Sequence, residues 1–233
     1  MPVFVVTGAS QGIGRAIAEA FAQEADARIA LVARNEEKLV QVVKACSARG
    51  ADAAAFPCDV TDEAAVAAMA LAVMEKWGAP DVLVNNAGVF QPGSLLETTL
   101  ASFRQQVDVN LVSAFSVTQQ FLKPMLDRNS GAIFYMASVA ALKAYPGGAA
   151  YCAAKHGLLG LARSVREETR NTGIRVTTLL PGATLTPSWD GVELPEERFM
   201  PATDIAKAVL DIYHMSDRTV VEEIVLRPQQ GDI

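Results

Sequence analysis

The chain has 233 residues, of which 51% are hydrophobic, and this is enough for one domain with a large core. Its formal net charge of −6 argues against nucleic acid or an anionic membrane as the main partner. We therefore expect a single domain over residues 1–233 that binds neither of them.

The N-terminus and the cysteines indicate where the protein works. Residues 1–7 lack the basic region of a signal peptide, and no uninterrupted apolar run approaches the roughly eighteen residues that span a bilayer. The three cysteines form no metal-type pair and suit a reducing cytosol, and with only two histidines a zinc site is not expected. The sequence thus predicts a cytoplasmic protein without a metal ion.

The first chemical signal is a glycine-rich turn. The short apolar run Val3–Val6 is followed by Gly8-x-x-x-Gly12-x-Gly14 and by an alanine-rich helix from Arg15 to Gln23. Unpaired N–H groups at such a helix start, together with the helix dipole, favour a pyrophosphate. Because no Gly-Lys-Ser/Thr follows, the pattern favours dinucleotide binding over a P-loop nucleotidase.

Strand and helix patterns alternate along the rest of the chain. After Val3–Val6, strands are predicted at Arg28–Ala33, Ala53–Cys58, Asp81–Asn85, Ala132–Met136, Arg175–Leu180 and Glu223–Leu226. The intervening helices are predicted after Asn35 to about Arg49, after a cap at Thr61 or Asp62, and over Leu100–Leu126, Ala149–Glu168 and Ala202–His214. This alternation predicts an α/β fold, a doubly wound parallel sheet with helices on both faces. Ligands bind such sheets beyond the carboxyl ends of the strands.

The chemistry is expected at Tyr151-Cys152-Ala153-Ala154-Lys155. On a helix, positions four apart lie on one face, so the Tyr151 hydroxyl and the Lys155 ammonium should share an edge. A cation held close to a tyrosine lowers its pKa from about 10, which makes it useful in acid-base catalysis. We expect Cys152 and His156 to point elsewhere on the helix.

These pieces together resemble the short-chain dehydrogenase/reductase family over nearly the whole chain. The matching motifs, in order, are Thr7-Gly8-x-x-x-Gly12-x-Gly14, Asp59, Asn85-Asn86-Ala87-Gly88, Asn110, Ser138, Tyr151-x-x-x-Lys155 and Pro181-Gly182-x-x-x-Thr186. The resemblance implies a Rossmann-like sheet of seven strands and hydride transfer with a nicotinamide cofactor.

The resemblance also implies roles for single residues. Tyr151 would be the acid-base group, Lys155 would lower its pKa and bind the nicotinamide ribose, and Ser138 would hydrogen-bond the substrate oxygen. Asn110 would hold a water that connects Lys155 to solvent. Asp59 would meet the adenine amino group, and Asn86 the adenosine ribose. The full set of implied cofactor contacts is Gly8, Ser10, Gly12, Ile13, Gly14, Arg34, Asp59, Val60, Asn86, Ala87, Gly88, Tyr151, Lys155, Pro181, Gly182, Thr184 and Thr186. Asn85 is interpreted as a structural brace.

The end of the second predicted strand favours NADP(H) over NAD(H). Dinucleotide folds that prefer NAD place a carboxylate there, about 20 residues beyond the glycines, whereas this chain has Ala33 and Arg34. Arg34 offers a forked cation for a 2′-phosphate, and Ser10 could add a hydroxyl donor. Glu36 and Glu37 are expected to point toward solvent.

The substrate is expected to be a small or medium ketone, aldehyde or secondary alcohol. The segments expected to line its pocket, residues 89–91, 140–145 and the substrate loop 183–201, are mostly apolar. One alternative is reduction of a 3-oxoacyl thioester on an acyl carrier protein, which the acidic chain and its C-terminal residues 225–233 disfavour. A non-catalytic cofactor-binding sensor is a second alternative, which the presence of Tyr151 and Lys155 disfavours.

We also expect a homodimer or homotetramer with two-fold symmetry, because members of this family commonly pair through the helices that contain Asn110 and Tyr151. The apolar residues expected to support such pairing are Phe115, Phe121, Leu158, Leu159 and Leu161.

Overall fold

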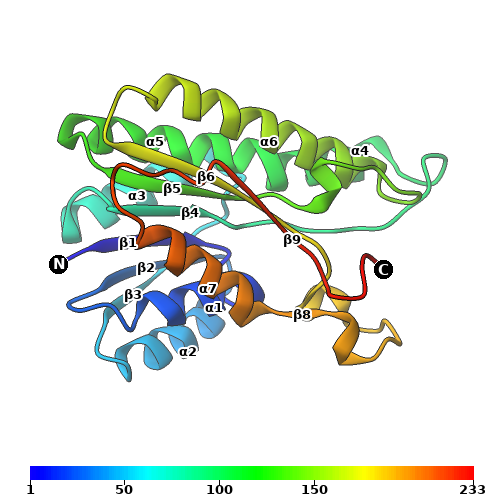
Figure 1. The fold of residues 1–233 in the computed structure, drawn as a ribbon, viewed down its shortest axis with the longest axis horizontal. Coiled ribbons are helices and arrows are strands. Elements are labelled where there is room, and N and C mark those ends of the chain that lie inside the picture. The colour runs from blue at the N-terminus through cyan, green and yellow to red at the C-terminus, as the bar shows by residue number, and fades with distance from the viewer.

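The computed structural model describes all residues from 1 to 233 and has a parallel sheet at its centre (Figure 1). The sheet has seven strands in the order β3-β2-β1-β4-β5-β6-β9, and every neighbouring pair is parallel. Its strands are β1 (Val3–Thr7), β2 (Arg28–Ala33), β3 (Asp52–Pro57), β4 (Val82–Asn85), β5 (Gly131–Met136), β6 (Ile174–Pro181) and β9 (Glu223–Leu226). The expected doubly wound parallel sheet of seven strands is thus confirmed.

Helices cover both faces of the sheet. One face carries α1 (Gly12–Phe21), α2 (Glu36–Ser47) and α7 (Ala202–Tyr213), and the other carries α3 (Glu63–Trp77), α4 (Leu100–Val107), α5 (Ser113–Arg128) and α6 (Ala149–Thr169) (Figure 1). Central strands such as β1 are buried along their whole length, since they have a helical layer on either side. Two apolar cores, one on each face, result from this arrangement.

Residues that cap helices fix several helix ends, and two of these caps were predicted from the sequence. The Asn35 side chain accepts from the backbone N–H of Lys38 at the start of α2. Of the two candidates for the next cap, Asp62 performs the role, accepting from the N–H groups of Ala64 and Ala65. At the far end of α3, Gly78 has φ of +86°, a conformation that glycine adopts without a steric penalty.

Three features differ from the sequence expectation. The first helix begins at Gly12 rather than Arg15, inside the glycine-rich turn. The long helix expected over Leu100–Leu126 is interrupted by a π-helical turn, η1 (Asp108–Val112). Within the expected substrate loop, β7 (Thr184–Leu185) pairs with β8 (Met200–Pro201), and short 3-10 turns η3 (Pro187–Trp189) and η4 (Glu196–Arg198) lie between them. Neither a single wide turn nor a two-residue strand leaves a periodic pattern that sequence reading could detect.

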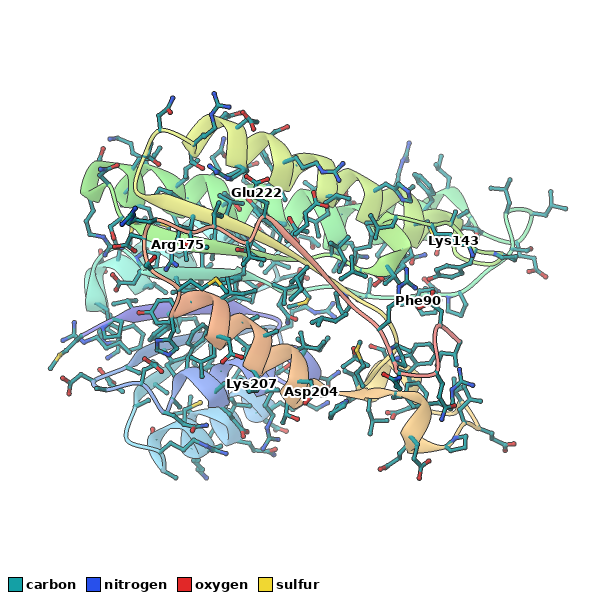
Figure 2. The ribbon with its side chains drawn as sticks, in the orientation of Figure 1. Phe90, Lys143, Arg175, Asp204, Lys207 and Glu222 are labelled. Atoms are coloured by element: carbon teal, nitrogen blue, oxygen red, sulfur yellow. The ribbon has the colours of Figure 1, made fainter.

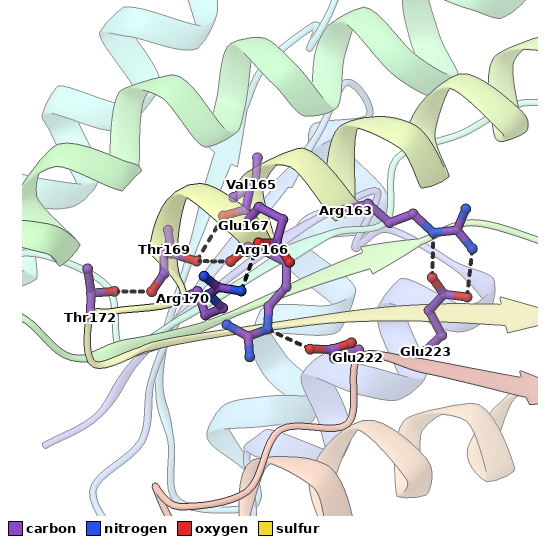
Figure 3. A network of polar contacts seen from close by, with 9 residues as sticks. All are labelled: Arg163, Val165, Arg166, Glu167, Thr169, Arg170, Thr172, Glu222 and Glu223. Carbon is purple, nitrogen blue, oxygen red and sulfur yellow. Dashed lines mark hydrogen bonds and ion pairs between the residues drawn. The ribbon is translucent and has the colours of Figure 1, made fainter.

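Ion pairs tie α6 to the edge strand β9 and to Glu222, the residue just before it (Figure 3). The Nε atom of Arg163 lies 2.7 Å from a Glu223 carboxylate oxygen, and the Nε atom of Arg166 lies 3.1 Å from one of Glu222. Exposed pairs of this kind add little stability on their own, but charges along an edge strand discourage pairing with another sheet.

Candidate active site

The candidate site lies beyond the carboxyl ends of the strands, where two cavities adjoin. The tyrosine cavity, of about 540 Å³, is the one that Tyr151 lines. The arginine cavity, of about 580 Å³, is the one that Arg34 lines. Both cavities are bordered by Gly8, Gln11, Gly88 and Val89, so together they form one elongated site.

Almost all residues singled out from the sequence come together here. The tyrosine cavity is lined by Gly8, Gly12, Ile13, Asn86, Gly88, Asn110, Ser138, Tyr151, Lys155, Pro181, Gly182, Thr184 and Thr186. The arginine cavity is lined by Gly8, Ser10, Arg34, Asp59, Val60, Ala87 and Gly88. Gly14 alone lines neither.

Ser138, Tyr151 and Lys155 form the chemical centre of the tyrosine cavity. Ser138 follows β5 and caps η2 (Val139–Ala141), where its hydroxyl accepts from the Ala140 N–H at 3.1 Å. Tyr151 and Lys155 lie one turn apart on α6, and the Lys155 Nζ atom is 5.6 Å from the centre of the tyrosine ring. The same ammonium donates to the Met136 carbonyl oxygen at 2.8 Å. The helix therefore presents a proton-transfer group and a cation on one edge, as expected.

The electrostatics of this pair differ from the sequence expectation. Burial raises the pKa of Tyr151 to about 12, and a hydrogen bond from Ser138 only partly opposes that rise. Burial also lowers the pKa of Lys155 from 10.5 to about 7, because water is excluded from its ammonium. The expected lowering of the Tyr151 pKa by Lys155 is absent here, since a lysine that is half neutral at pH 7 is a weak partner for a phenolate.

Asn110 lies in the π-helical turn η1, and its side chain is 1% exposed. Its amide nitrogen donates to the carbonyl oxygens of Val89 at 2.8 Å and Gln106 at 2.9 Å, and its oxygen accepts from the Val89 N–H at 3.2 Å. A Cβ on Gly88 would lie 2.8 Å from the Asn110 oxygen and 3.6 Å from the Lys155 Nζ atom, so glycine lets these groups approach. π-Helical turns often occur at functional sites, and this one directs Asn110 at the loop after β4. Its water-holding role stays a prediction.

The glycine-rich turn is built for close approach. Gly8 and Gly12 have φ of +65° and +56°, in the left-handed region that favours glycine. A Cβ on Gly14 would lie 2.4 Å from the Gly8 carbonyl oxygen, so Gly14 packs the helix against the turn rather than lining a cavity. The Asn86 amide donates to the Thr7 and Gly8 carbonyl oxygens at 2.9 and 3.4 Å. Asn86 thus holds the turn and borders the tyrosine cavity, and its contact with the adenosine ribose stays a prediction.

The arginine cavity has a cationic side and an anionic side. Asp59 accepts from the N–H and the hydroxyl of Thr61 at 3.0 and 2.8 Å, and these bonds, with a smaller effect of Arg34, lower its pKa. Glu36 and Glu37 are exposed and line neither cavity, as expected.

Sequence reading missed several residues that line the cavities. In the arginine cavity these are two cations, Lys38 and Arg104, of which Lys38 donates to the Gln11 side chain at 2.7 Å. In the tyrosine cavity, Asp232 and Ile233 come from the far end of the chain. The spacing of Lys38 on α2 after Arg34 was a usable signal. Arg104, Asp232 and Ile233 belong to no motif and are brought in only by the fold.

The two cavities fit a dinucleotide. They continue into one another past the glycine-rich turn, whose positive φ angles leave room for a pyrophosphate, and Arg34 and Lys38 supply positive charge at one end. At the other end lie Ser138, Tyr151 and Lys155, which can stabilise and protonate an oxygen. Fold and site together define an oxidoreductase of the doubly wound dinucleotide-binding class.

Comparison with known proteins agrees with this assignment to the dinucleotide-binding oxidoreductases. The family model for short chain dehydrogenase matches residues 2–196, and the chain belongs to that family. It is 38% identical to a sepiapterin reductase of Chlorobaculum tepidum, covering 99% of this chain and 98% of that protein. It is 35% identical to a 3-oxoacyl-[acyl-carrier-protein] reductase of Staphylococcus aureus, covering 88% of this chain and 87% of that one. Among solved structures, an alcohol dehydrogenase from Thermococcus sibiricus complexed with 5-hydroxy-NADP is 28% identical, with a TM-score of 0.92 over 100% of this chain and 99% of that one.

Proposed function

We propose that this protein transfers a hydride between NADP(H) and a small or medium carbonyl compound or secondary alcohol. The observation that carries the proposal is the meeting of Ser138, Tyr151 and Lys155 in a cavity that continues to Arg34. An acid-base group, an oxyanion donor and a phosphate-binding cation along one elongated site are what such a transfer needs.

Each side chain has a defined task in this scheme. The nicotinamide supplies or accepts the hydride. Tyr151 gives a proton to the carbonyl oxygen during reduction, or takes it from the alcohol during oxidation. With its pKa raised to about 12, Tyr151 holds its proton at neutral pH, which is the form that reduction requires. Ser138 donates to the same oxygen, and Lys155 binds the nicotinamide ribose with its ammonium.

Preference for NADP(H) rests on Arg34. No carboxylate stands at Ala33 to repel a 2′-phosphate, and the arginine cavity carries Arg34 together with Lys38. The bound 5-hydroxy-NADP of the Thermococcus sibiricus enzyme supports the same choice.

The relatives suggest two specific substrates, sepiapterin and a 3-oxoacyl thioester. The first is favoured by the higher identity and by coverage of nearly both whole chains. A carrier-bound thioester would bring an acidic carrier protein to an acidic chain, which disfavours it.

The test is a carbonyl panel read by NADPH absorbance. It contains simple ketones and aldehydes, sepiapterin and an acetoacetyl thioester, each with NADPH and with NADH. We expect turnover of at least one carbonyl with NADPH, and loss of that turnover in Tyr151→Phe. A protein that binds NADPH but turns over no carbonyl would instead be a cofactor-binding sensor.

As part of the proposal, the enzyme is cytoplasmic and assembles as a homodimer or homotetramer. No helix is long and apolar enough to cross a membrane. Phe121, Leu158 and Leu159 are buried in the core, so they cannot support assembly as expected, because α5 and α6 use them against the sheet. Of the expected residues, Phe115 is exposed and Leu161 is half-buried, and further support comes from the exposed side chains of Leu100, Phe103 and Val112 on α4 and η1.

A further inference from the structure

Aromatic side chains gather around the candidate proton donor. The Phe90 ring meets the Tyr151 ring edge to face, with 5.1 Å between centroids, and the Tyr145 ring in the same manner at 6.4 Å. All three line the tyrosine cavity. Phe90 lies at the carboxyl end of the sheet, beside the segment that carries Lys143 (Figure 2). One wall of the cavity is therefore aromatic where the reaction is expected.

The structure holds Phe90 in place from both sides. The buried Asn110 amide bonds the N–H and the carbonyl oxygen of Val89, the residue before it. The buried Gln106 amide bonds the N–H of Gln91, the residue after it, at 3.2 Å, and its carbonyl oxygen at 3.1 Å. Two buried amides are thus used to fix the backbone on either side of one phenylalanine. Such a rigid ring is pre-organised to receive a ligand.

A second aromatic group enters the cavity from a different part of the chain. Trp189 lines the tyrosine cavity and belongs to the segment between β7 and β8. In Figure 1 this segment lies below the carboxyl ends of the strands, opposite the loops after β4 and β5. The Phe199 ring packs edge to face against Trp189 at 5.1 Å and is itself buried. The pairing of β7 with β8 closes the base of this segment. Trp189 is therefore supported from behind while one side borders the cavity.

Resting on the proposed hydride transfer, we propose that the substrate carries a planar, unsaturated ring beside its carbonyl group, and that Phe90, Tyr145 and Trp189 select that ring. Aromatic pairs gain stability beyond the apolar area they bury, and this gain is absent for a saturated ring or an alkyl chain. A flexible chain also loses conformational freedom when it is ordered, which a planar ring does not. The aromatic walls thus distinguish ring-bearing carbonyls from linear acyl chains of equal size.

The first experiment compares three methyl α-diketones whose other substituent is phenyl, cyclohexyl or n-hexyl, so that carbon number stays constant. We expect kcat/KM with NADPH to be at least about fivefold higher for the phenyl compound than for either other compound. Equal values, or preference for the hexyl compound, would overturn the proposal.

Variants separate recognition by the protein from the intrinsic reactivity of the diketones. Trp189→Leu keeps an apolar side chain, does not touch Tyr151, and should reduce the phenyl-to-cyclohexyl ratio at least about threefold. Phe90→Leu should reduce the same ratio, whatever it does to the absolute rate through Tyr151. Phe56→Leu is the matched control, because it removes an edge-to-face contact with Trp77 at 6.0 Å, away from both cavities. Its ratio should equal that of the wild type, and an unchanged ratio in both test variants would refute the assignment.

A binding measurement keeps the inference separate from catalysis. The chain has two tryptophans, so Trp77→Phe leaves Trp189 as the single tryptophan reporter. Titration with the phenyl diketone should change its fluorescence at a concentration at least about fivefold lower than the cyclohexyl diketone requires. Preferential binding without turnover would preserve this inference and contradict the proposed function, whereas equal binding would contradict the inference alone.

Discussion

Replacing Lys155 with methionine should change how the stability of the protein depends on pH. The lysine side chain is 3% exposed, and its burial lowers the pKa from 10.5 to about 7. In the unfolded chain the pKa returns to its ordinary value. Between pH 7 and pH 10.5 the unfolded chain therefore binds more protons than the folded chain, and the free energy of unfolding rises with pH across this window.

The size of the effect follows from the same values. Each pH unit within the window changes the free energy of unfolding by about 1.36 kcal/mol for one group. From pH 7 to about pH 9, the wild type should gain about 2–3 kcal/mol relative to Lys155→Met, which has no ammonium to titrate. At or below pH 7 the variant should be the more stable protein, because methionine fills similar space without a buried charge.

Urea unfolding at several pH values between these limits, at fixed protein concentration, measures this difference. Lys44→Met, which removes an exposed lysine from α2, is the matched control and should follow the wild type at every pH. If the difference in free energy of unfolding between wild type and Lys155→Met stayed constant within about 0.5 kcal/mol across these pH values, the lowered pKa of the buried Lys155 ammonium would be refuted.

Three further predictions concern the cofactor, the turn and the assembly. In fluorescence titrations, Arg34→Ala should weaken NADPH binding by about tenfold to a hundredfold and change the affinity for NADH by less than about threefold. Ala33→Asp should shift the preference toward NADH. Equal losses of affinity for both cofactors in Arg34→Ala would show that Arg34 does not bind the 2′-phosphate. Gly14→Ala should lower the free energy of unfolding by about 1–3 kcal/mol, because its Cβ would collide with the Gly8 carbonyl oxygen and the Asn86 amide, and an unchanged urea midpoint would contradict that packing. Light scattering at micromolar protein should give two or four times the 24.7 kDa of one chain, and the mass of a single chain would refute assembly.

Short-range sequence patterns predicted the strands of the sheet and most of the residues that line the two cavities. Strands such as β2 and β9 were predicted at their observed bounds, because each apolar run is short and clearly bordered. Ser138 follows β5 and Arg34 follows β2, and they line two adjoining cavities because parallel strands bring their carboxyl ends to one edge of the sheet.

Properties that depend on burial or distant contacts were not accessible from the sequence. The direction of the Tyr151 pKa was wrong, because the exclusion of water raises it more than the Ser138 hydrogen bond lowers it, and this exclusion depends on the whole surrounding structure. The hold of Asn110 on the backbone beside Phe90 comes from a π-helical turn without a sequence signature. Asp232 reaches the cavity only after the last strand is in place.

The most direct test of the central claim, that Tyr151 is the proton donor for hydride transfer, is the rate of Tyr151→Phe with NADPH and the best carbonyl of the panel. We expect a fall in kcat of at least about a hundredfold, with the affinity for NADPH unchanged, because only the hydroxyl is lost. Tyr145→Phe, which removes the other tyrosine hydroxyl of the cavity and keeps its ring, should retain at least about half of the rate. A Tyr151→Phe enzyme that kept more than roughly a tenth of the wild-type rate would contradict the claim.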